Sequence, residues 1–205
     1  MRASIRLLTA IALIGICGFA LARGWGIVHF SLDSAKKRPD ITARWAAAPD
    51  VASAALRAEV RANINISDAK AANSRREALA SILSIKPMSS IDWLSLSGVK
   101  FDTDQPVEQV LGSLRLSAIT GPNESYVMTE RAIIAVSLWE DLPSDLKSRA
   151  AIDIGPMIFP RTPAEGEVAA RLRAVVSRKP EWVSNELRKA LLAAGFAPKE
   201  IGKLL

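Results

Sequence analysis

A run of sixteen residues without a charged side chain, Leu7 to Ala22, constrains this chain most. Arg2 and Arg6 precede the run, so the sequence begins with a basic head and an apolar stretch, as secretory signals and signal-anchors do. The run falls slightly short of the roughly 20 residues that cross a bilayer core, and the mostly apolar residues 24–30 extend it. We therefore expect a single-pass anchor over residues 1–30. The side chains expected to contact lipid are Leu7, Leu8, Ile11, Leu13, Ile14, Ile16, Phe19 and Leu21.

The basic head favours a cytoplasmic N-terminus, which places the rest of the chain in the periplasm, attached to a bacterial inner membrane. Residues 31–48 are expected to form a linker, and residues 49–205 a helical-hairpin domain. Ala20-Leu21-Ala22 also has the small-x-small pattern of a cleavage site. The alternative is therefore a secreted or periplasmic protein that is released by cleavage near Ala22.

The charge distribution argues for lipid, and against nucleic acid, as the basic segment's partner. The formal net charge of the chain is +6, and +5 of it lies in the first 38 residues, which flank the apolar run. Everything from Pro39 onward carries only +1. Basic residues beside an apolar segment suit anionic head groups, whereas a nucleic-acid-binding domain needs its positive charge on the folded part.

The residues from 49 onward lack the side chains that most catalytic and metal sites use. The one cysteine, Cys17, lies in the apolar run, and the one histidine, His29, lies just after it. This distribution excludes a disulfide, a Cys- or His-based metal site and a Ser-His-Asp triad from the domain. No glycine-rich phosphate loop is present either. We expect a protein that is not an enzyme and binds no cofactor.

One pair of residues supports an enzymatic alternative. Glu124-Ser125 resembles the Glu-Ser pair of lytic transglycosylases, in which the glutamate is the general acid. A periplasmic glycan-cleaving enzyme that uses Glu124 is therefore kept as an alternative. The competing interpretation is that Glu124 lies in the first turn of a helix, where the dipole favours carboxylates.

Start and stop signals for helices recur throughout the domain, which predicts an all-α fold. Ser90 is expected to cap a helix, although the alternation of residues 93–101 also fits a strand. Thr162-Pro163-Ala164-Glu165 is a capping box, and Gly195 is a natural C-terminal cap. The helices are predicted at 40–48, 50–61, 67–85, 90–101, 104–119, 124–139, 143–158, from 163, 180–194 and 198–205.

The spacing of the predicted helices indicates a repeat. Starts near Ser67, Asp104, Pro143 and Pro180 are 37 to 39 residues apart, and each interval holds two helices. This rhythm predicts an α-solenoid of antiparallel helix hairpins, in which each hairpin buries the apolar face of the next. An irregular helical bundle is the alternative, because the residues themselves do not repeat.

Three segments carry a resemblance to a known family. PMSSIDWLSL (87–96), TGPNE (120–124) and LWEDLP (138–143) resemble small membrane-anchored, tetratricopeptide-like helical proteins of alphaproteobacteria, over residues 67–160. The resemblance implies a role beside envelope polysaccharide synthesis or export and no catalytic residues.

The expected function is that of a membrane-tethered, non-enzymatic interaction scaffold for a protein partner. Trp93, Trp139 and Trp182 are candidate partner contacts, because tryptophan is favoured at binding hot spots; core packing is the other interpretation. A secreted structural helical protein is a further alternative.

Overall fold

The computed structural model describes residues 12–18, 20–21, 24–25, 28–29, 54, 69–160, 163–202 and 204–205. Every regular element in these ranges is helical, which confirms the predicted all-α class. The strand alternative for residues 93–101 is wrong, because these residues belong to one helix.

The chain divides into two compact units, Met1–Lys86 and Pro87–Leu205. In the first unit, helix α4 spans Ala69–Ile85; the helices expected at 40–48 and 50–61 fall outside the described residues, apart from position 54.

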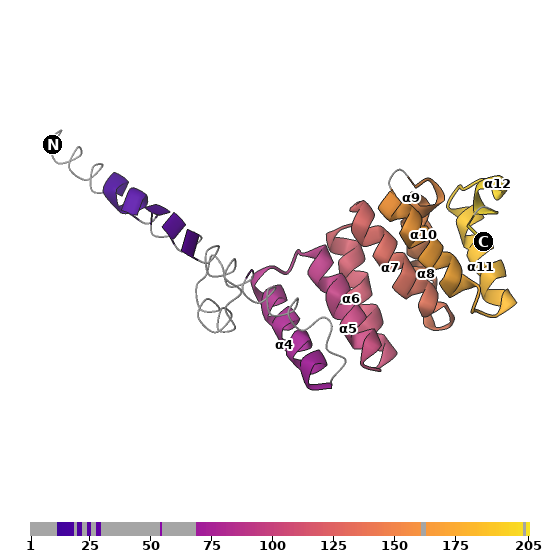
Figure 1. Cartoon of the computed structure of the whole chain (residues 1–205), viewed down its shortest axis with the longest axis horizontal. Helices are drawn as coiled ribbons and strands as arrows, with labels where there is room; N and C mark the ends of the chain where they lie inside the picture. Colours follow the sequence, from indigo (N-terminus) through magenta and orange to yellow (C-terminus); the bar gives the residue numbers. More distant parts are fainter. Residues whose placement is uncertain are drawn as a thin grey trace. The chain divides into compact units, whose positions relative to one another are not determined.

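The second unit contains the helices from α5 to α12 (Figure 1). They are α5 (Ser90–Asp102), α6 (Val107–Thr120), α7 (Ser125–Ser137), the 3₁₀ turn η1 (Trp139–Asp141), α8 (Ser144–Asp153), α9 (Gly155–Ile158), α10 (Pro163–Val176), α11 (Glu181–Ala193) and α12 (Pro198–Ile201).

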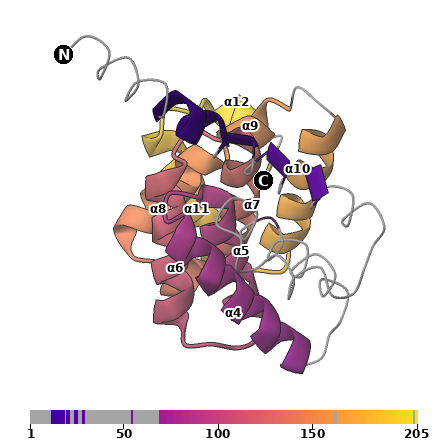
Figure 2. The same ribbon diagram turned by 90° about the vertical axis from the view of Figure 1, so that its left-hand side faces the viewer.

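The long helices of this unit form two layers. Helix α7 packs against α5 and α10, while α8 packs against α11 and is joined to α6 by the Arg115–Asp145 ion pair. Figure 2 shows α5, α7 and α10 on one side of the unit, with α6, α8 and α11 on the other. In the second layer, Val107, Ser144 and Glu181 begin successive helices 37 residues apart.

A continuous apolar core lies between the layers. Fully buried side chains from successive helices contribute to it, and the largest is Trp139. Helix α11 shows why the sequence places its helices this way: Val183, Leu187 and Leu191 recur every four residues and are all fully buried. Burying such a stripe contributes roughly 1.5 to 3 kcal/mol per side chain, far more than helix propensity does.

The predicted stop at Gly195 is confirmed in detail. Gly195 adopts φ +94°, a left-handed conformation that favours glycine. Its N–H donates to the carbonyl of Leu192 at 3.0 Å, and the N–H of Phe196 donates to that of Leu191 at 3.2 Å. These two bonds define a Schellman motif, and the turn directs Phe196 back towards the helices.

Three local predictions are wrong. The helix expected over 198–205 ends at Ile201, as the short helix α12. Ser90 does not cap α5: Ser89 occupies the N-cap position, and the Ser90 hydroxyl bonds Glu124 instead. The helix expected over 143–158 is divided into α8 and α9, because Pro156 has no N–H and its ring would clash with a carbonyl one turn earlier. Pro163 is the first residue of α10, as predicted, while Thr162 lies outside the described residues.

Candidate functional site: a cleft beside the start of α7

The expected lipid-facing residues are only partly described. Leu7, Leu8, Ile11 and Phe19 lie outside the described residues. Leu13, Ile14, Ile16 and Leu21 are helical, and each is more than half exposed. Within the described ranges, no helix is both long enough and apolar enough to span a bilayer.

The three candidate tryptophans have different environments. Trp139 is fully buried, and its Nε1 donates to the Glu186 carboxylate at 3.1 Å, so its ring belongs to the core and offers no contact surface. Trp93 is half-buried, and its Nε1 donates to the carbonyl of Pro87 at 2.7 Å. Trp182, on α11, exposes 48% of its surface. Trp182 is therefore the most exposed of the three candidates.

Glu124 and Ser125 point to different partners. The Ser90 hydroxyl donates to Glu124 Oε2 at 2.6 Å, while the Ser125 hydroxyl donates to Glu165 Oε1 at 3.4 Å. The bond between Ser90 and Glu124 depends on Gly121. A Cβ added at Gly121 would lie 2.4 Å from the Cβ of Ser90, so only glycine leaves room for the Ser90 side chain. Glu124 thus ties the turn before α7 to the start of α5.

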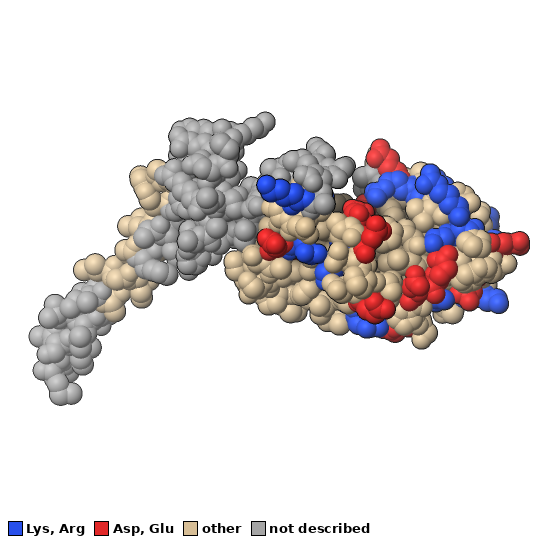
Figure 3. All heavy atoms as spheres, turned by 90° about the horizontal axis from the view of Figure 1, so that it is seen from below, with Lys and Arg blue, Asp and Glu red and all other residues tan. Residues whose placement is uncertain are grey.

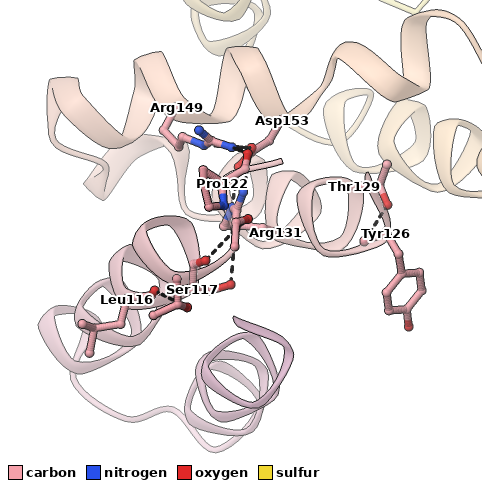
Figure 4. Close-up of polar contacts among 10 residues, drawn as sticks. Leu116, Ser117, Pro122, Tyr126, Thr129, Arg131, Arg149 and Asp153 are labelled. Atoms are coloured by element: carbon pink, nitrogen blue, oxygen red, sulfur yellow. Dashed lines mark hydrogen bonds and ion pairs between the residues drawn. The ribbon is translucent and has the colours of Figure 1, made fainter. Parts of the chain in front are cut away.

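A buried ion pair fixes the same turn from the other side (Figure 4). The Arg131 guanidinium donates to both carboxylate oxygens of Asp153, at 2.5 and 2.8 Å, and both side chains are almost fully buried. Its third nitrogen donates to the carbonyls of Ser117, at 3.0 Å, and Gly121, at 3.4 Å. Arg149 donates to Asp153 at 2.9 Å. A guanidinium with every branch bonded locks α6, α7, α8 and the turn in one geometry.

The turn forms one edge of an open cleft of about 360 Å³. Five of its lining residues are apolar or lack a side chain: Met128 from α7, Gly155 and Pro156 from α9, Phe159 after α9, and Phe196 after α11. Phe159 is 50% exposed, while Met128 is buried. A Cβ added at Gly155 would lie 3.1 Å from the Phe196 ring. The absence of a side chain at Gly155 therefore lets the ring pack closely against α9, where both residues line the cleft.

Three polar residues complete the cleft lining: Asn123, Ser125 and Glu165. Among the described residues that line the cleft, Glu165 is the only one that carries a charge. Apolar walls with a few convergent polar groups are the usual composition of a binding pocket. The described residues include no cluster of three His, Cys, Asp or Glu side chains able to hold a metal. The cleft therefore has the lining to bind an apolar group.

In the part of the chain that the structure describes, four ion pairs on the surface outside the cleft join different helices or turns: Arg115–Asp145, Lys147–Glu186, Arg171–Glu130 and Lys179–Glu140. Lys179 donates to Glu140 at 2.8 Å and lowers the pKa of that carboxyl. Hydrogen bonds from Lys147 and Trp139 lower the pKa of Glu186. Figure 3 shows acidic and basic side chains interspersed over one face of the second unit. This mixture suits a solvated surface rather than one that binds a polyanion.

The sequence signals did not reveal the cleft, because its residues come from four separate segments between Asn123 and Phe196. The one usable local signal is Gly195-Phe196, an aromatic side chain placed directly after a helix stop. The chain matches no protein-family model, no curated protein and no solved structure. The described residues are all-helical in their regular elements, and the second unit has two layers and an open, largely apolar cleft.

Proposed function

We propose that this protein is a membrane-tethered, non-enzymatic interaction module whose second unit binds a protein partner through the cleft beside α7. The observation that carries the proposal is the cleft itself, in which half-exposed Phe159 stands beside buried Met128 with one carboxylate at the edge. Exposed aromatic side chains in a concave apolar site are typical of interaction anchors.

The helix arrangement supports an interaction role of the α-solenoid type. Second-layer helices begin every 37 residues, and in the first layer α5 packs against α7 and α7 against α10, in chain order. Solenoids of helix hairpins bind proteins along surfaces formed by successive repeats. The resemblance of residues 67–160 adds the tetratricopeptide-like class and a place beside envelope polysaccharide assembly.

The tether is proposed from the sequence. The uncharged run Leu7–Ala22 behind Arg2 and Arg6 favours insertion with the second unit in the periplasm. Full-length protein should sediment with inner membranes and resist extraction by alkaline carbonate, and a C-terminal alkaline phosphatase fusion should be active. An N-terminus beginning at Arg23 in the mature protein would instead support the secreted alternative.

Partner binding is tested by photocrosslinking in membranes. Benzoyl-phenylalanine replaces Phe159 in one variant and Ile152 in the other, a matched control that is 48% exposed on α8 and outside the cleft. A discrete adduct is expected from position 159 and not from position 152. Equal labelling from both positions, or none from either, would contradict the proposal.

A further inference from the structure

We draw no further inference here: the strongest candidate, the exposed face of α11 that carries Trp182 and Leu192, lies on a helix with two acidic and two basic side chains, so nothing in the structure shows what covers it.

Discussion

Removing the Asp153 carboxylate should be the most destabilising single change in the second unit. Arg131 and Asp153 expose 2% and 1% of their side chains, so Asp153→Ala leaves a guanidinium buried without its counter-ion. Breaking one side of a buried pair costs about 3–5 kcal/mol. The whole stability of such a domain is about 5–15 kcal/mol, so the variant should lose a large fraction of it.

The complementary variant should cost less. Arg131→Met removes the buried cation, but Asp153 keeps the bond from Arg149 at 2.9 Å, and we expect a loss of about 2–3 kcal/mol. Replacing both residues, as Arg131→Met with Asp153→Ala, removes both charges and should cost less than the two single changes added together. The double-mutant cycle should therefore report a coupling of about 2–3 kcal/mol.

Urea unfolding of the full chain in mild detergent measures these differences. Tryptophan fluorescence, to which the buried Trp139 contributes, reports loss of the core, and far-ultraviolet circular dichroism reports loss of helix. The reasoning is refuted if Asp153→Ala costs less than about 1 kcal/mol, or if the two single changes simply add in the double variant.

Three further outcomes follow from individual contacts. Gly121→Ala should lower the urea concentration at the unfolding midpoint, because the new Cβ would lie 2.4 Å from a side chain of α5. Gly112→Ala is the control: its Cβ would meet open space, and we expect it to stabilise the fold by about 0.5–1 kcal/mol in the same titration. Lys179 lowers the pKa of Glu140 below 4.5, so their ion pair stabilises the fold above that pH and loses its effect as the pH falls through the lowered pKa. Lys179→Met should reduce this loss of stability at acid pH by about 0.5 kcal/mol, measured by thermal unfolding at a series of pH values. Glu124→Gln should leave cell-wall digestion by the purified protein at the level of the unchanged chain, and a drop specific to this variant would favour the glycan-cleaving alternative.

The helices were predictable because their boundaries are set by local chemistry. Pro143 and Pro180 each directly precede a helix, and Gly195 stops α11 because a left-handed residue is needed there. These effects involve residues within one helical turn of each other, so these helix ends can be predicted from neighbouring residues in the sequence. The 37-residue rhythm of the second layer follows from the same signals.

The tertiary structure alone decided which side chains meet. Ser90 was expected to cap its own helix, yet a carboxylate 34 positions later takes its hydroxyl. Trp139 was a candidate contact and is buried, while Phe159 and Phe196, from separate segments, face one cleft. Caps and stops act over neighbouring residues and can be identified along the chain; burial and cleft formation depend on how whole helices pack, which no local pattern specifies.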